Sequence, residues 1–188
     1  MAEQAAVPGA RHGGNPVLKV IGWLSTLCGF IAAGMIVSAV VITCQMIWIR
    51  FVLNGSTIWQ TEAVTYLMVG ATMVGLPYVQ RLRGHVNVDL LPMMLPMGLR
   101  KALALLTLGA GITVIGIMVF FGFEFWHLAW KRGWTSDTVW GVRLWIPYLA
   151  LPVGFGLYLV QLGGDLYAVI VGIERPFGIG DGIPGEEL

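Results

Sequence analysis

Four long apolar runs constrain this chain more than any other feature of its sequence. They cover residues 20–48, 63–79, 102–125 and 144–171. A helix crosses the hydrocarbon core of a bilayer with about 17 to 25 apolar residues, so each run is long enough to span it. The runs lack the alternation of polar and apolar residues that is typical of barrel strands in an outer membrane. We therefore predict an all-α integral membrane protein with four transmembrane helices.

The small number of charges agrees with this class. Charged residues make up 11% of the 188 residues, whereas a soluble domain has about 25%. The formal net charge is only +1, which argues against a nucleic-acid partner. The two cysteines, Cys28 and Cys44, both lie in the first run. They would be about 24 Å apart along a helix, which is too far for a disulfide.

The segments outside the runs define the expected domain organisation. We expect residues 1–17 to be a flexible cytoplasmic tail, residues 18–174 the membrane domain, and residues 175–188 an acidic cytoplasmic tail. The first and fourth runs exceed the minimum for a span, which predicts tilt or extension beyond the bilayer. Residues 90–99 are apolar but interrupted by two prolines, and we expect this short segment to lie along the inner membrane surface.

Basic residues predict the orientation, because they accumulate in cytoplasmic loops. Four spans place both termini on the same side as the central loop. Seven basic residues fall on that side and four on the other: Arg11, Lys19, Arg81, Arg83, Arg100, Lys101 and Arg175 against Arg50, Lys131, Arg132 and Arg143. Both termini should therefore be cytoplasmic. Seven of the eight tryptophans fall near the outer interface, which indicates an outer rim that anchors the spans and also meets a partner.

Three carboxylates lie in or beside the spans, where ionisable groups are functional candidates. Glu62 opens the second run and can complement the helix dipole, or form an ion pair with Arg50 or with a partner. Glu124 lies three residues before His127 on the same helix face, so the two can bond each other, line an interface or form a proton relay. Asp165 lies toward the end of the fourth run. We expect no polar residue near mid-span to pair with a second one, which argues against a pump or carrier acting alone.

The sequence carries no recognisable catalytic, cofactor or metal motif. The three histidines are His12 in the tail, His85 in the central loop and His127 near the outer face. No two of them share a depth at which they would hold a haem. We therefore predict no enzymatic activity, no catalytic residues, no metal and no cofactor.

Small residues allow membrane helices to approach each other closely. Two pairs with a spacing of four residues occur in the first and second runs, and three glycines occur in the third. These candidates are Gly34 with Ser38, Ala71 with Gly75, and Gly109, Gly111 and Gly116.

The polar stretch between the second and third runs contains more than a turn requires. Arg81 and Arg83 are expected to meet anionic lipid headgroups where the second span ends. Gly84 permits a turn at positive φ. His85 and Asp89 follow, and Asp89 can cap the expected surface segment. A plain connecting loop explains the arginines but not the His-x-x-x-Asp spacing.

The stretch Gly84–Leu91 resembles the Gly-His-Ile-x-Val-Asp signature of the small membrane subunit of tripartite ATP-independent periplasmic (TRAP) transporters, the DctQ-like family. Val86 stands where that signature has isoleucine. Trp59 and Glu62 match the family's Trp-x-x-Glu at the entry to the second span. Residues 135–161 are similar to the entry of its fourth span.

The resemblance, which covers about residues 19–171, implies a role without chemistry of its own. In this family a periplasmic binding protein (DctP-like) captures an organic acid. A large membrane subunit (DctM-like) then carries it inward by an elevator motion coupled to sodium. The small subunit is a scaffold for the large one in the bacterial inner membrane and helps dock the binding protein. The implied partners are both of these proteins and membrane phospholipids, and the substrate stays open.

Two groups of residues become site candidates under this resemblance. The inner-loop group is expected at the interface with lipid and the large subunit, and comprises Arg81, Arg83, Gly84, His85 and Asp89. The outer-rim group is expected to take part in docking, and comprises Trp59, Glu62, Lys131, Arg132 and Arg143.

Two other classes of protein remain open. A self-contained small carrier or channel, acting as a homo-oligomer, would need polar residues at the membrane centre. A four-helix membrane enzyme or cytochrome subunit would need histidines paired at one depth.

Overall fold

The computed structural model describes residues 16–82 and 96–172. This part of the chain forms the helices α1 (Pro16–Phe51), α2 (Gln60–Arg81), α4 (Met97–Arg132), α5 (Trp145–Tyr148) and α6 (Ala150–Val171). Helices α1, α2 and α4, and α5 running into α6, are each long and apolar enough to cross a membrane. The prediction of an all-α protein with four membrane-spanning helices is confirmed.

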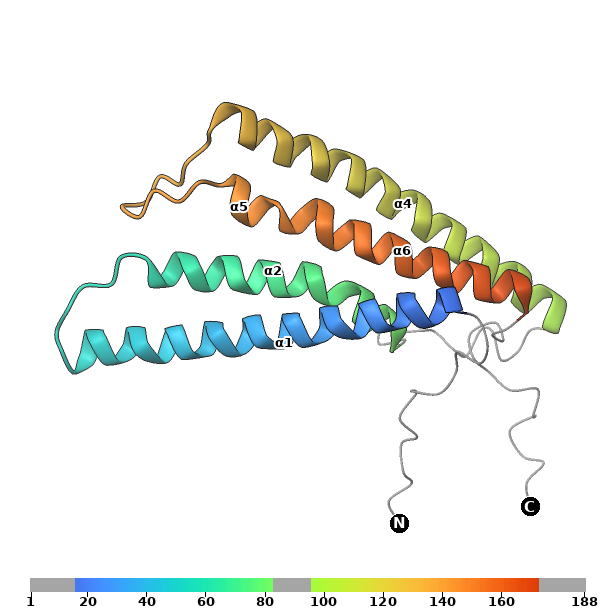
Figure 1. Cartoon of the computed structure of the whole chain (residues 1–188), viewed down its shortest axis with the longest axis horizontal. Helices are drawn as coiled ribbons and strands as arrows, with labels where there is room; N and C mark the ends of the chain where they lie inside the picture. The colour runs from blue at the N-terminus through green and yellow to red at the C-terminus, as the bar shows by residue number, and fades with distance from the viewer. Residues whose placement is uncertain (1–15, 83–95, 173–188) are drawn as a thin grey trace, which may run out of the picture.

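The long helices lie in a row in the order α1, α2, α6 and α4 (Figure 1). Helix α1 packs mainly on α2, α2 also packs on α6, and α6 packs on α4. The row is narrow at the end where α1 begins and α6 ends, and it spreads like a fan toward the other end. We call these the inner end and the outer end, after the orientation that the basic residues predict.

Helices α1 and α4 are much longer than a bilayer is thick. Each has 36 residues, which corresponds to about 54 Å, against about 30 Å for the hydrocarbon core. The sequence predicted excess length in the first and fourth spans, which are α1 and the α5–α6 segment. In the structure the two longest spans are instead the first and the third, α1 and α4. Helix α4 gains length because it continues past its apolar run into charged residues at both ends, including Lys131 and Arg132 in its last turn.

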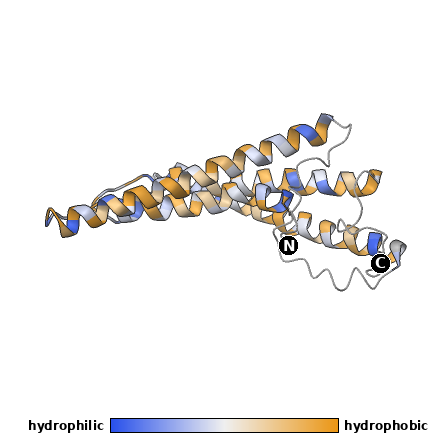
Figure 2. Ribbon diagram, turned by 90° about the horizontal axis from the view of Figure 1, so that it is seen from below, coloured by the Kyte–Doolittle hydropathy of each residue, from blue (hydrophilic) through white to orange (hydrophobic). Residues whose placement is uncertain are grey.

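Most large apolar side chains point outward from the row of helices. In Figure 2 the helices are orange along much of their length, with polar residues mainly toward the ends. The residues buried between helices are mostly small, and include Cys28, Ala32, Ala39, Ala71 and Ala168. Because lipid provides no hydrophobic drive between helices, contact depends on the close approach that small residues permit.

Two glycines mark places where helices approach each other closely. Gly154 of α6 lies so near α2 that a Cβ at this position would be 2.7 Å from both Cβ and O of Met73. Gly29 of α1 lies against the ring of Tyr78 of α2, where a Cβ would be 2.5 Å from the ring. Larger side chains at either position would force the helices apart.

The prediction, made from spacing alone, that certain glycines allow helices to pack closely is only partly correct. A Cβ at Gly75 would lie 3.5 Å from Cβ of Ala32, as expected for a helix contact. Positions Gly34, Gly109 and Gly116 have no atom within 4 Å of the Cβ site, so their predicted close packing within this part of the chain is wrong. Spacing identifies a helix face, but it does not say whether a neighbouring helix covers that face.

Candidate interaction surfaces

Five polar side chains from three helices meet toward the inner end. Ser25 Oγ of α1 donates a hydrogen bond to Gln161 Oε1 of α6 over 2.6 Å. Gln161 Nε2 donates to Asp165 Oδ1 at 2.8 Å, and Gln80 Nε2 of α2 donates to Asp165 Oδ2 at 2.9 Å. The Tyr158 hydroxyl donates to Gln80 Oε1 at 3.3 Å. We call these residues the inner cluster, and they join α1, α2 and α6.

The inner cluster corrects an expectation from the sequence. Ser25 and Gln161 are each only 3% exposed, and buried polar groups are costly unless they are hydrogen-bonded. Gln161 lies at the middle of α6 and bonds to two polar partners, so the expectation that no mid-span polar residue is paired is wrong. That expectation weighed Glu62, Glu124 and Asp165 and overlooked the amide of Gln161. The spacing of Tyr158, Gln161 and Asp165 along one helix face was the available signal.

Arg81, at the last residue of α2, bonds to α1. Its Nη1 atom donates to the backbone oxygen of Gly22 at 2.6 Å and to the hydroxyl of Thr26. A Cβ at Gly22 would lie 3.4 Å from the guanidinium carbon, so the glycine leaves room for the side chain. This nitrogen of Arg81 therefore holds α2 to α1. The other members of the inner-loop group, Arg83, Gly84, His85 and Asp89, lie outside the described residues.

A hairpin connects α4 to α5 at the outer end, and we call residues 133–144 the outer hairpin. Gly133 ends α4 in a left-handed conformation at φ 60°, which glycine adopts without strain. Ser136 N donates to Val142 O at 2.8 Å, and Leu144 N donates to Trp134 O at 2.9 Å. These two hydrogen bonds flank the isolated antiparallel bridge between Thr135 and Arg143 and hold the two arms of the hairpin together.

The outer hairpin contacts the start of α2. The Thr138 hydroxyl donates a hydrogen bond to the carboxylate of Glu62, which also accepts one from the Tyr66 hydroxyl. The rings of Trp140 and Trp59 lie 6.0 Å apart between centroids. The structure thus brings Trp59 and Glu62 together with the hairpin. Trp140 is one of the tryptophans expected near the outer interface, whereas nothing in the sequence pointed to Thr138.

The remaining outer-rim residues lie nearby. Lys131 and Arg132 are the last two residues of α4, directly before the hairpin, and Arg143 belongs to the hairpin itself. All three side chains are exposed. Arg50 donates its Nε proton to the Thr57 hydroxyl at 2.8 Å. Within the described residues no ion pair joins Glu62 to Arg50, so the structure does not form the ion pair that was one alternative for Glu62.

Aromatic rings connect the outer part of α4 to α5. Trp130 lies 4.9 Å from Trp145, measured between ring centroids, and 5.3 Å from Trp126. Phe125 lies 4.9 Å from Tyr148. Such rings favour the level of the lipid headgroups, so they indicate the depth at which the outer part of α4 sits.

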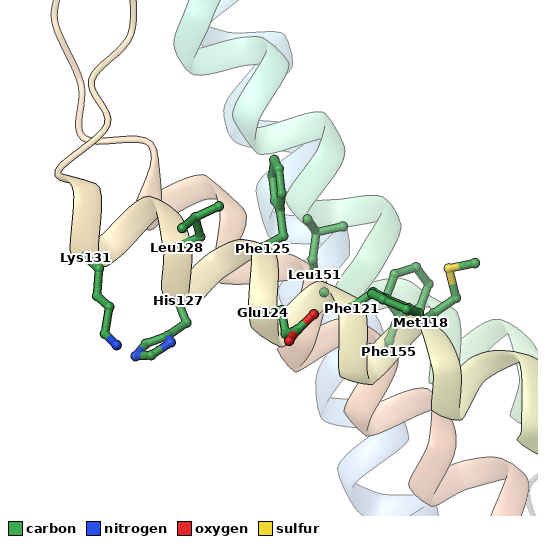
Figure 3. A pocket seen from close by; sticks show the side chains of 10 residues that line it. Met118, Phe121, Glu124, Phe125, His127, Leu128, Lys131, Leu151 and Phe155 are labelled. Atoms are coloured by element: carbon green, nitrogen blue, oxygen red, sulfur yellow. The ribbon is translucent and has the colours of Figure 1, made fainter.

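An open groove runs along the outer half of α4, beside the start of α6. It has a volume of about 740 Å³ and includes Phe121, Glu124, His127, Leu151 and Phe155. The side chains of Glu124, His127 and Lys131 point to the same side of α4 (Figure 3). The ring of His127 stacks on that of Phe123, with centroids 5.9 Å apart. We call this the α4 groove.

These arrangements hold helices and loops together. Within residues 16–82 and 96–172, no three His, Cys, Asp or Glu side chains come together as metal ligands would. Hydroxyl donors bond to Glu62, and amide donors bond to Asp165. The chemistry that these groups can perform in this geometry is hydrogen bonding and packing.

Comparisons with known proteins agree on one family. Residues 39–172 match the family model described as the DctQ component of tripartite ATP-independent periplasmic transporters. The chain is 21% identical over 164 residues to the C4-dicarboxylate TRAP transporter small permease protein DctQ of Vibrio cholerae serotype O1, covering 76% of this chain and 71% of that protein. It is 24% identical over 154 residues to the isethionate TRAP transporter permease protein DctMQ of Oleidesulfovibrio alaskensis, covering 78% of this chain but 24% of that protein.

Proposed function

This chain belongs to the family of DctQ components of tripartite ATP-independent periplasmic transporters, and we propose that it acts as the scaffold for a large membrane subunit. In this proposal the large subunit carries an organic acid inward by an elevator motion coupled to sodium. The present chain widens and steadies that subunit in the bilayer. It also helps to dock a periplasmic binding protein that delivers the substrate.

The open row of helices is the observation that carries the scaffold role. In the most apolar stretch of α4, only 6% of residues are buried within the chain. A protein that formed a transport path by itself would have to enclose that path, whereas these helices spread apart toward the outer end. The DctMQ relative supports a large partner, because the region similar to this chain is 24% of one longer permease protein.

We place the chain in the bacterial inner membrane with both termini in the cytoplasm. The excess of basic residues on the side of the termini supports this orientation. The outer hairpin would then face the periplasm, together with Lys131, Arg132 and Arg143. An exposed basic rim of this kind can steer an acidic surface of a partner toward it. The inner-loop group would lie at the cytoplasmic surface against phospholipid and the large subunit.

The names of the two relatives indicate a broad class of substrate. The two relatives are named for C4-dicarboxylate and for isethionate, which are both small organic anions. We propose a small organic anion as the transported substrate. Because the small subunit need not touch the substrate, its own residues do not narrow this class further.

The docking role is tested by charge reversal in the complete transporter. The double variant Lys131→Glu/Arg132→Glu should lower sodium-driven uptake into vesicles several-fold, because rim charges chiefly affect the rate of association. The matched control is Lys131→Arg/Arg132→Lys, which keeps both positive charges at the rim and should retain uptake. Unchanged uptake in the outer double variant, with the complex intact, would remove the docking role of these residues.

The inner-loop role is tested separately. His85→Ala and Asp89→Ala should reduce the yield of the complex with the large subunit, because they remove hydrogen-bonding groups from the proposed contact. Normal complex yield and normal uptake in both variants would show that these residues have no such role.

A further inference from the structure

We infer that a transmembrane helix of the large subunit packs into the α4 groove and places a basic side chain opposite Glu124. This inference rests on the proposed function, because it takes the large subunit as the partner. Beyond the proposed function, it names the α4 groove as the face that contacts the large subunit and a basic residue as the partner of Glu124.

The position of Glu124 along α4 places its carboxylate close to the edge of the hydrocarbon. It lies two residues before Trp126 and six before Trp130. These separations correspond to about 3 and 9 Å along the helix axis. Because tryptophan rings favour the headgroup level, Glu124 lies where the hydrocarbon begins, and an unpaired charge that faces lipid there is costly.

Glu124 differs from the other two carboxylates discussed above in its partners. Glu62 and Asp165 each accept two hydrogen bonds. Within the described residues Glu124 makes no hydrogen bond or ion pair, and its side chain is exposed. His127, on the same side of α4, instead stacks on Phe123. Lys131 also lines this groove, but within the described residues it forms no ion pair with Glu124. A cation from outside the chain is therefore the complement that this position lacks.

The shape of the groove suits a helix from a partner. Helix α4 packs on the start of α6 beside the groove, since a Cβ at Gly122 would make an ordinary contact, 3.7 Å from Cβ of Leu151. Phe121 on α4 and Leu151 and Phe155 on α6 line the groove (Figure 3). Apolar side chains of a neighbouring helix can pack among these residues while a basic one reaches Glu124.

Charge distinguishes this face from the other exposed helix of the row. Helix α1 also exposes large apolar side chains, including Phe30, Val37 and Val41. However, α1 contains no acidic or basic residue between Lys19 and Arg50. Lipid tails can therefore cover that apolar surface without leaving a charge unpaired. The carboxylate on α4 needs a specific partner, which assigns the large subunit to α4 and leaves α1 facing lipid.

Photo-crosslinking in the intact complex tests the contact directly. The chain is expressed together with its large subunit, and the photoreactive residue p-benzoylphenylalanine replaces Phe121 in the groove. The matched control carries the same residue in place of Phe30, which is 74% exposed on α1. We expect a covalent product with the large subunit from position 121 and lipid adducts from position 30.

Charge reversal at Glu124 tests the basic partner. Glu124→Lys should lower recovery of the large subunit with the tagged chain about tenfold, because two cations would then face each other where water is excluded. Glu124→Gln should lower it less, since the amide still accepts a hydrogen bond. Gln45→Lys is the control, because it adds a charge to the exposed face of α1 at a similar distance from the outer end.

The outcomes separate this inference from the proposed function. If the unmodified chain recovers no large subunit, the proposed function fails and the inference fails with it. If the unmodified chain recovers the large subunit but position 121 forms only lipid adducts, the proposed function stands and the inference is wrong. Crosslinks to the large subunit from position 30 instead of position 121 would also overturn it.

Discussion

The hydroxyl of Thr138 donates a hydrogen bond to the carboxylate of Glu62, 76 residues earlier in the chain. This bond fastens the outer hairpin to the beginning of α2 at the end where the helices spread apart. The contact between Trp59 and Trp140 lies beside it. Together these contacts give the exposed outer rim a defined shape, which a docking surface requires.

Removing this hydrogen bond should loosen the hairpin. Thr138→Val keeps the shape of the side chain but removes the donor, so we expect faster amide hydrogen exchange at residues 134–144 with little change elsewhere. Hydrogen exchange measured by mass spectrometry in detergent or nanodiscs reports this directly. The control is Thr113→Val, since the Thr113 hydroxyl bonds only to the backbone of its own helix. Exchange in the hairpin that stays the same in Thr138→Val would contradict the fastening role.

The closest packing of α2 against α6 predicts a strong effect of one methyl group. Gly154→Ala would place a Cβ 2.7 Å from Cβ and O of Met73, and overpacking of this kind costs about 1–3 kcal/mol. The variant should therefore unfold at a lower temperature than the parent in the same detergent. Gly156→Ala is the matched control two residues along the same helix, where no atom lies within 4 Å of the Cβ site. Equal stability of the two variants would show that the helices are not in close contact at Gly154.

The inner cluster predicts coupled effects of two buried residues. Gln161→Leu removes the acceptor of Ser25 and one donor to Asp165, and each lost partner of a buried polar group costs about 1–3 kcal/mol. Ser25→Ala should cost less in the Gln161→Leu background than in the parent chain, because the shared hydrogen bond is already lost. Unfolding in mixed micelles, followed by tryptophan fluorescence, measures both changes. Strictly additive changes would mean that the two side chains do not interact.

The proposed orientation predicts which loops a membrane-impermeant reagent can reach. In a Cys28→Ala/Cys44→Ala background, Asp137→Cys in the outer hairpin should react with an impermeant maleimide added to spheroplasts. Lys101→Cys, near the start of α4, should react only after the membrane is opened. The reverse pattern would place the termini outside and would overturn the assignment of the outer rim to the periplasm.

The sequence predicted the helices better than the contacts between them. Apolar runs located all four membrane-spanning helices because the bilayer thickness sets a minimum length. They did not locate the helix ends, since backbone hydrogen bonds continue α4 past its apolar run to Arg132. The positions of Gly34 and Gly154 look alike in the sequence, yet only Gly154 lies against a neighbouring helix.

In the candidate site, too, the sequence predicted residues of a local pattern but not their partners from other parts of the chain. Trp59 and Glu62 were chosen from a local pattern, and the structure brings them together at the outer hairpin. Their partner Thr138 was not predictable, because the choice depends on how a hairpin from another part of the chain folds back. Gln161 was missed for a related reason: a single amide in an apolar run gains meaning only when Ser25 of α1 is placed beside it.

Gentle purification of the tagged chain from its native membrane, followed by measurement of the mass and identity of what accompanies it, tests the scaffold role. We expect a stoichiometric complex with one large polytopic membrane protein. We also expect sodium-driven uptake of a small organic anion only when that complex and the periplasmic binding protein are reconstituted together. A monodisperse homo-oligomer of this chain that transports without any partner would overturn the scaffold role and establish a self-contained carrier instead.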